Sequence, residues 1–214
     1  MIAVFRPPFP SLSADNSIGS GGKMKESQAQ IDCEKSVYKV LMKNRHPHIV
    51  HAVLCAPEGI FMHRQATSLD IRLQNPDIPQ YLKEKWIRQI SSALSWLEHL
   101  GFAHGDLRPP NIFLSQEEDI RLGDFDCTVK IGDKLKAGGG SFGKLHENYE
   151  FSDASPMTEQ YSLGSCIFTI QFGHELWHEI YEHQKILKLI RNEFPDASGD
   201  EMFGEIIHKC WHGN

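Results

Sequence analysis

Three oxygen-bearing side chains in the middle of the chain have the types that phosphoryl transfer requires. Asp106 stands in the run His-Gly-Asp-Leu-Arg-Pro-Pro-Asn that ends at Asn111, and Asp124 follows after an apolar run and a polar turn. Two carboxylates and a carboxamide supply the oxygen ligands that a hard divalent cation prefers, and one carboxylate is left to accept a proton from a hydroxyl. The segment therefore predicts a centre where a metal ion carries phosphates.

This segment, from His104 to Asp126, resembles the catalytic loop and the metal-binding loop of the protein kinases. Their pattern is His-Arg-Asp-Leu-Lys-x-x-Asn followed by Asp-Phe-Gly, and the order, the spacing and the intervening apolar strand all agree. The resemblance covers about residues 26–212, and Phe194-Pro195-Asp196 with a closing Cys-Trp is similar to kinase-like proteins of filamentous fungi. It implies an α+β, two-lobed fold with a reduced small β lobe and a mainly helical large lobe.

The resemblance implies a role for each polar residue of the segment. Asp106 would accept or orient the proton of the substrate hydroxyl. Arg108 stands where many kinases have lysine, so it would contact the transferring phosphoryl group, and it favours serine or threonine over tyrosine as the acceptor. Asn111 and Asp124 would hold Mg²⁺ on the phosphates of ATP, while His104 is expected to pack under the loop.

Apolar periodicity and turn residues indicate the elements that must position this centre. We predict strands at residues 2–5, 50–55 and 59–63, and helices at about 26–42, 68–73, 80–99, 159–171, 182–191 and 201–210. Residues 11–23, with the cluster Gly19-Ser20-Gly21-Gly22, are interpreted as a linker rather than a phosphate loop. The expected division is a flexible segment at 1–25, a reduced small lobe at 26–65 and a helical large lobe at 66–214.

The resemblance also places the nucleotide. Met62 would lie at the back of its pocket, and His63, Arg64 and Gln65 would form a hinge whose backbone groups bond the adenine ring. Glu34, on the predicted helix at 26–42, would pair with a strand lysine that holds the phosphates. The alternative for Glu34 is one more solvated helix carboxylate.

The phosphate-binding elements of a kinase small lobe are missing from the residues before Glu34. If residues 2–5 are the remnant of the lysine-bearing strand, Phe5 occupies the lysine position and nothing before it forms the Gly-rich hairpin. Lys23 or Lys25 could substitute from the linker, but a mobile lysine is poorly preorganised. The nucleotide would then lack both the Gly-rich hairpin over its phosphates and the strand lysine that binds them.

Four positions depart from, or only loosely match, the kinase pattern. The segment after Asp126 is rich in Gly and Ser, and we expect it to be mobile. In the kinase pattern an arginine pairs with a phosphate on this segment, and Gly105 replaces that arginine. A phosphate would therefore find no arginine here with which to order the segment. Asp126 replaces the glycine of Asp-Phe-Gly and is either an extra metal ligand or a cost to metal affinity. Glu159 stands for the aspartate of the helix that anchors the large lobe, and Glu147 lies about where Ala-Pro-Glu would end.

Composition excludes several other classes of protein. The 214 residues carry a formal net charge of -6 without a basic stripe, which gives nucleic-acid binding no electrostatic basis. No apolar run reaches the roughly 20 residues that span a bilayer. Five scattered cysteines without a Cys-x-x-Cys pair argue against a disulfide framework or a zinc site. We expect a cytoplasmic or nuclear protein that acts on or binds another protein; its oligomeric state does not follow from the sequence.

Three functions stay open at this point. The first is an ATP- and Mg²⁺-dependent protein kinase, which the set Asp106, Asn111 and Asp124 supports. The second is a pseudokinase that serves as a binding or scaffold module, because the Gly-rich hairpin and the lysine are missing. The third is a small-molecule kinase of the aminoglycoside or choline type, whose pattern Gly105 and Asp126 fit. We favour a kinase-like phosphotransferase with impaired activity.

Overall fold

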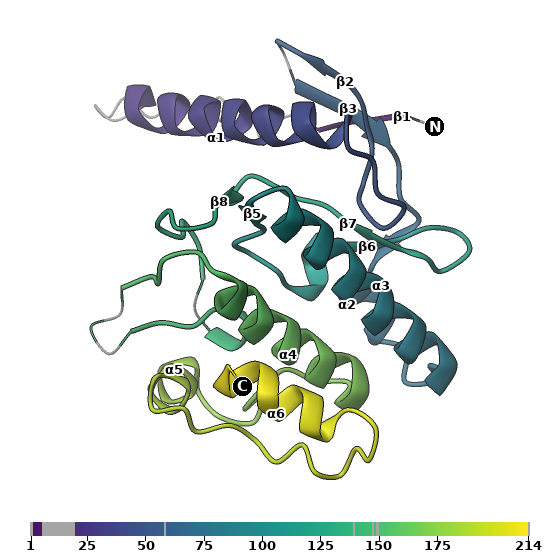
Figure 1. Cartoon of the computed structure of the whole chain (residues 1–214), viewed down its shortest axis with the longest axis vertical. Helices are drawn as coiled ribbons and strands as arrows, with labels where there is room; N and C mark the ends of the chain where they lie inside the picture. The colour runs from purple at the N-terminus through teal and green to yellow at the C-terminus, as the bar shows by residue number, and fades with distance from the viewer. Residues whose placement is uncertain are drawn as a thin grey trace.

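The computed structural model describes residues 2–5, 20–57, 59–138, 140–146, 148 and 150–213. Figure 1 shows a small sheet and the long helix α1 at one end of the molecule, helices α4, α5 and α6 at the other end, and α3 between them. The chain thus has a mixed α/β architecture, as predicted. None of the helices in the described part of the chain is long and apolar enough to cross a membrane.

The small sheet contains the three strands predicted near the N-terminus. Strands β1 (Ile2–Phe5), β2 (Ala52–Ala56) and β3 (Gly59–His63) form an antiparallel sheet in the order β1-β3-β2. In the pairing of β1 with β3, Phe5 lies opposite Ile60. The strand that precedes the predicted hinge therefore has the possible remnant of the lysine strand as its neighbour.

Helix α1 spans Ser20–Leu41, so it begins before the predicted start at residue 26. The predicted linker is wrong for residues 20–23, which are helical. Good helix formers such as lysine, methionine and glutamate follow the glycines, and their propensity extends the helix through residues that cost about 1 kcal/mol each. The apolar side chains of the helix that face the core are Ile31, Val37, Tyr38 and Leu41. Residues 11–19 of the predicted linker lie outside the described residues, and the division into lobes stays a prediction.

The other helices follow the predicted pattern. They are α2 (Leu69–Leu73), α3 (Gln80–His99), α4 (Pro156–Phe172), α5 (Glu182–Ile190) and α6 (Gly204–His212). Helix α3 has the predicted bounds, because its buried stripe is continuous and Gly101 follows its end in the left-handed conformation. Helix α4 begins earlier than predicted, since the Ser155 hydroxyl accepts from the Thr158 backbone N–H and Thr158 bonds back to Ser155.

Short strands and 3₁₀ turns place the candidate site between these helices. Strands β4 (Thr67–Ser68), β6 (Ile112–Leu114) and β7 (Ile120–Leu122) form one small sheet, and β5 (Phe102–Ala103) pairs with β8 (Val129–Lys130). The 3₁₀ turns are η1 (Pro109–Asn111) and η2 (Gly140–Phe142). The β6–β7 hairpin brings the loop before β6 and the loop after β7 to the same end of the sheet.

Helices α4 and α6 pack closely at Gly164. A Cβ atom at this position would lie 2.7 Å from the Cβ of Cys210 and 3.2 Å from the ring of Trp211. The indole nitrogen of Trp211 donates a hydrogen bond of 3.1 Å to the Ser165 hydroxyl. A glycine in a helix costs about 1 kcal/mol relative to alanine, so the close approach of the two helices is the reason for its presence.

We predict that Gly164→Ala destabilises the protein by about 1–3 kcal/mol, because overpacking against α6 outweighs the gain in helix propensity. Chemical denaturation measures the change. The matched control is Gly199→Ala, because a Cβ atom at Gly199 would have no neighbour within 4 Å. Equal stability of the two variants would contradict this account of the α4–α6 contact.

Candidate active site

Asp106 and Asn111 are joined by hydrogen bonds within one loop. The loop connects β5 to β6, and the 3₁₀ turn that opens with Pro109 brings Asn111 back over Asp106. The amide nitrogen of Asn111 donates to the Asp106 backbone oxygen and to its Oδ2, both at 2.9 Å. The side-chain nitrogen is therefore used within the loop, and the carboxamide oxygen of Asn111 is the atom left to bind a cation.

Asp124 lies on the neighbouring loop, after β7. The backbone N–H of Gly123 donates to the Asn111 carbonyl oxygen at 3.1 Å, which ties the two loops together. Asp124 has φ of 62°, the left-handed conformation that costs a residue with a side chain roughly 1–3 kcal/mol and is concentrated at functional sites. The structure thus brings together Asp106, Asn111 and Asp124, the three residues from which the sequence predicts a phosphate-bearing metal centre.

The site concentrates negative charge. Burial, followed by the charges of Asp126 and Asp106, raises the pKa of Asp124 to about 6. Burial also raises the pKa of Asp106, although the hydrogen bond from Asn111 and the charge of Arg108 act in the opposite direction. A divalent cation would relieve this repulsion, so the donor chemistry fits Mg²⁺.

Asn111 and Asp124 alone would not complete the coordination shell of Mg²⁺. Within the described ranges there is no group of three or more His, Cys, Asp or Glu side chains placed to hold a metal ion. Mg²⁺ is commonly held by one or two carboxylates together with substrate phosphates and water. The carboxamide oxygen of Asn111 and the carboxylate of Asp124 therefore suit a cation that arrives with phosphates.

His104 is buried beneath the two loops. Its Nδ1 accepts from the Asp106 backbone N–H at 3.3 Å, so the ring proton is on Nε2, which donates to the Gly123 carbonyl oxygen at 3.0 Å. Burial lowers the pKa of His104 to about 4, which keeps the ring neutral at physiological pH. These contacts agree with the structural role predicted for His104.

Glu159 on α4 holds the start of this loop. Its Oε2 accepts from the His104 backbone N–H at 2.8 Å, and its Oε1 accepts from the Gly105 backbone N–H at 3.2 Å. Burial raises the pKa of Glu159 to about 7, although the two backbone hydrogen bonds lower it. Glu159 was not among the predicted site residues, and its place in the helix pattern was the signal that could have identified it.

Gly105 is required by the backbone of the loop. It has φ of 80°, and a Cβ atom there would lie 2.7 Å from the carbonyl oxygen of Cys127. An arginine at this position would need the backbone to move. The replacement noted in the sequence is therefore built into the local geometry.

Glu34 is buried beside the metal-binding loop. Its exposed fraction is 2%, so the alternative of a solvated carboxylate is wrong. Burial, followed by the charges of Asp124 and Asp126, raises its pKa to about 7, while a hydrogen bond from the Phe125 backbone lowers it. No lysine among the described side chains acts on this pKa; the side chains of Lys23 and Lys25 lie outside the described part.

Three rings link α1 to both loops. The ring centroids of Tyr38 and Phe125 are 5.3 Å apart with the planes at 84°. Phe125 is also 5.3 Å from the ring of His104. The edge contact of Tyr38 and the tilted contact of His104 thus connect α1, which carries Glu34, to the loop of Asp106 through the ring of Phe125.

The residues predicted for adenine lie at the end of β3. Met62 is half-buried and packs against the core, whereas His63 and Arg64 are exposed. The Gln65 side chain donates to the His63 carbonyl oxygen at 2.8 Å. The nucleotide contacts of these residues stay a prediction.

Two further residues singled out in the sequence lie elsewhere. Arg108 is exposed beside Asp106, and Glu147 lies outside the described residues.

We predict that Glu159→Ala destabilises the protein by about 2–4 kcal/mol, because two backbone N–H groups lose their acceptor in a buried place. Urea denaturation measures the loss. Glu201→Ala is the matched control, since Glu201 is exposed in a turn. A Glu159→Ala variant as stable as this control would show that the loop does not depend on the carboxylate.

We predict that stability depends on pH through Glu34. Because its folded pKa is raised, the folded state keeps a proton that the unfolded state releases, and this stabilisation is lost as pH rises from 4.5 towards about 7. The slope from one such group is at most about 1.4 kcal/mol per pH unit. The stability of wild type relative to Glu34→Gln should therefore fall over this range, and a constant difference would contradict the burial of an ionisable Glu34.

Comparison of the sequence with known proteins identifies the family of this chain. The model of the protein kinase domain matches residues 20–212. A "Probable serine/threonine-protein kinase" of Saccharomyces cerevisiae is 27% identical in an alignment of 184 residues that covers 71% of this chain and 50% of that protein. Mitogen-activated protein kinase kinase kinase 4 of Homo sapiens is 23% identical over 75% of this chain and 11% of its own length. A dual specificity protein kinase of Dictyostelium discoideum is 22% identical over 86% of this chain and 29% of its own length. The chain thus spans half or less of these relatives, and it belongs to the protein kinase family.

Proposed function

We propose that this chain transfers the γ-phosphoryl group of ATP to a serine or threonine hydroxyl of a protein, and that its activity is impaired. The observation that carries the proposal is the joined set of Asp106, Asn111 and Asp124. In this proposal the sheet and α1 form a reduced small lobe, residues 63–65 form the hinge, and the helices from α2 onward form the large lobe. The relatives named as serine/threonine kinases support the acceptor class.

The residues of the loop divide the chemistry between them. Asp106 orients the acceptor hydroxyl and takes its proton, and Asn111 fixes the carboxylate for this task through Oδ2. Arg108, exposed beside Asp106, brings a permanent positive charge to the transferring phosphoryl group. Mg²⁺ held by Asn111 and Asp124 would neutralise phosphate charge when ATP is bound.

Impairment follows from the surroundings of Glu34. In an active kinase this carboxylate pairs with a lysine that holds the phosphates. Here the charges that act on it come from Asp124 and Asp126, and both are negative. Lys23 or Lys25 would have to supply the cation, and their place on α1 rather than on a strand makes them a poor replacement. The same observation favours a second candidate, a pseudokinase that binds a protein partner.

At or below about pH 6, Asp126 would weaken metal binding through its effect on the protonation of Asp124. Its charge and its side-chain hydrogen bond both raise the pKa of Asp124, so a proton competes with the metal for the Asp124 carboxylate. Metal affinity should therefore fall as pH drops through about 6.

The five cysteines form no disulfide, which supports our proposal of a cytoplasmic or nuclear location.

Thermal denaturation with ATP, in the presence and absence of Mg²⁺, tests the binding step. We predict that Mg-ATP raises the melting temperature and that Asp124→Asn removes the effect, because the variant loses a charged metal ligand. Asp126→Asn should enlarge the effect at pH 6; a smaller one would make Asp126 a ligand. No stabilisation of wild type by Mg-ATP would sink the kinase proposal and leave the pseudokinase.

A restored lysine tests the cause of the impairment. Phe5 is the position of β1 that would carry the lysine, opposite Ile60. We predict that Phe5→Lys strengthens Mg-ATP binding about tenfold, the effect of one charge-assisted contact. Val4→Lys is the matched control, since neighbouring residues of a strand face opposite sides. Equal binding by both variants would show that β1 does not replace the lysine strand.

Phosphorylation assays with peptides, choline and an aminoglycoside as acceptors then distinguish a protein kinase from a small-molecule kinase.

A further inference from the structure

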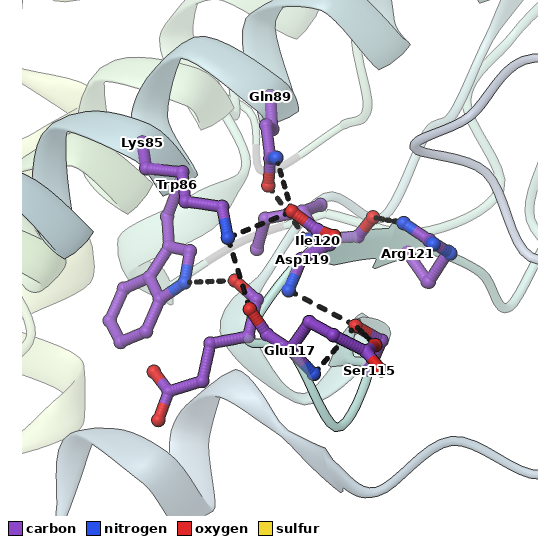
Figure 2. A network of polar contacts seen from close by, with 9 residues as sticks. Lys85, Trp86, Gln89, Ser115, Glu117, Asp119, Ile120 and Arg121 are labelled. Carbon is purple, nitrogen blue, oxygen red and sulfur yellow. Dashed lines mark hydrogen bonds and ion pairs between the residues drawn. The ribbon is translucent and has the colours of Figure 1, made fainter.

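A pocket of about 470 Å³ opens beside α3, and it shares no residue with the candidate active site. The five residues that line it all have polar side chains: His48, Lys85, Arg88, Gln89 and Ser92. Four of these side chains come from α3, and His48 comes from the loop between α1 and β2. Hydrogen bonds connect the pocket wall to the turn between β6 and β7 (Figure 2). The pocket therefore joins three separate parts of the chain.

The wall of the pocket has a surplus of positive charge. Figure 2 shows Lys85 and Gln89 converging on Asp119, with Lys85 Nζ at 2.8 Å from its Oδ1. The charge of Lys85 is thus balanced. Arg88 is exposed on the same helix, and among the described residues it has neither an ion pair nor a hydrogen bond from its side chain. Because the whole chain carries a net charge of -6, a pocket with an unbalanced guanidinium is a local exception.

Gln89 is held so that one of its hydrogens remains available. Its Nε2 donates to Asp119 Oδ1 at 2.8 Å, and its Oε1 accepts from the Ile120 backbone N–H at 2.8 Å. An amide has two N–H donors, so the second is free for a ligand. The side chain is preorganised by these two bonds, which lowers the entropy that binding must overcome.

Ser92 is also left as a donor. The Nδ1 of His46 accepts from the His48 backbone N–H at 3.3 Å, so the ring proton of His46 is on Nε2. That Nε2 lies 3.2 Å from the Ser92 hydroxyl oxygen and donates to it. The hydroxyl hydrogen of Ser92 can then point at a bound acceptor.

His48 contributes a polar atom that the fold leaves unsatisfied. Its Nδ1 is buried and has no hydrogen-bond partner among the described residues. Burial, followed by the charge of Arg121, lowers the pKa of His48, with Lys85 acting in the same direction and Asp119 against it. Two cations, Arg121 and Lys85, and one carboxylate, Asp119, thus act on this ring, and cationic side chains near a site attract an anion.

We propose that this pocket binds a phosphate monoester or inorganic phosphate, with the guanidinium of Arg88 as its main charged contact and with Gln89 and Ser92 as further donors. Arginine matches the phosphate group in charge and in its planar pair of donors. A hydroxyl on the phosphate could donate a hydrogen bond to the unpartnered Nδ1 of His48. This proposal is independent of the proposed function, because no residue of the candidate active site takes part.

Nuclear magnetic resonance on the full chain labelled with ¹⁵N tests the proposal. The probes are inorganic phosphate, O-phosphoserine and, as the uncharged comparison, serine; no nucleotide is added. We expect both phosphates to shift the side-chain signals of Gln89 and Arg88 at millimolar concentration, and serine to leave them unchanged. Arg88→Gln should weaken binding about tenfold. Arg191→Gln, an exposed arginine at the end of α5, is the matched control and should bind as wild type does.

The relative affinities of the probes identify the source of the phosphate. Tighter binding of O-phosphoserine supports a phosphorylated side chain as the ligand, and equal binding supports free phosphate. Absence of shifts at Gln89 with either phosphate would overturn the proposal. Equal binding by wild type and a folded Arg88→Gln variant would overturn it as well. Thermal denaturation of each variant checks that it is folded, as expected for the exposed side chain of Arg88.

Discussion

The candidate site depends on one carboxylate that accepts two backbone hydrogen bonds. Glu159 on α4 fixes His104 and Gly105 through their N–H groups, and the next residue is Asp106. A helix from a distant part of the sequence therefore helps to position Asp106, the proposed proton acceptor. Gly105 can take the required conformation because it has no side chain, and the buried ring of His104 joins this loop to Gly123 and so to Asp124. The Glu159 contact thus connects α4 to the first loop, and the His104 bond to Gly123 connects that loop to the second.

Charge explains why a site with the right residues is expected to work poorly. Burial and the negative charges of neighbouring carboxylates raise the pKa of Glu34 to about 7 and that of Asp124 to about 6. A divalent cation would reduce the repulsion between these carboxylates and the phosphates of a nucleotide, so the part of the site near Asp124 suits a metal ion. The side that should hold the phosphates against Glu34 has β1 and the helical residues 20–25 in place of a Gly-rich hairpin and a strand lysine. We therefore expect the residues proposed for phosphoryl transfer to be complete and the elements proposed to bind the nucleotide phosphates to be deficient.

Much of the fold follows from local sequence, whereas the contacts of the site do not. The apolar stripe and the following Gly101 predict α3 to the residue, and the order of Asp106, Asn111 and Asp124 predicts the site. Glu159 bonds residues 54 and 55 positions away, which no periodicity reveals. The burial of Glu34 depends on its contact with Phe125, so sequence left two alternatives open. The early start of α1 was missed because the glycines at its first turns are typical of linkers, and their neighbours' helix propensity outweighs that preference.

Single-turnover phosphoryl transfer at rising ATP concentration tests the central claim most directly. The claim is that the catalytic residues are complete and that nucleotide binding is weak. It predicts slow transfer to a protein or peptide hydroxyl that increases with ATP well into the millimolar range and disappears in Asp106→Asn at every concentration. Transfer that is absent at saturating Mg-ATP, or that persists unchanged in Asp106→Asn, would contradict the account.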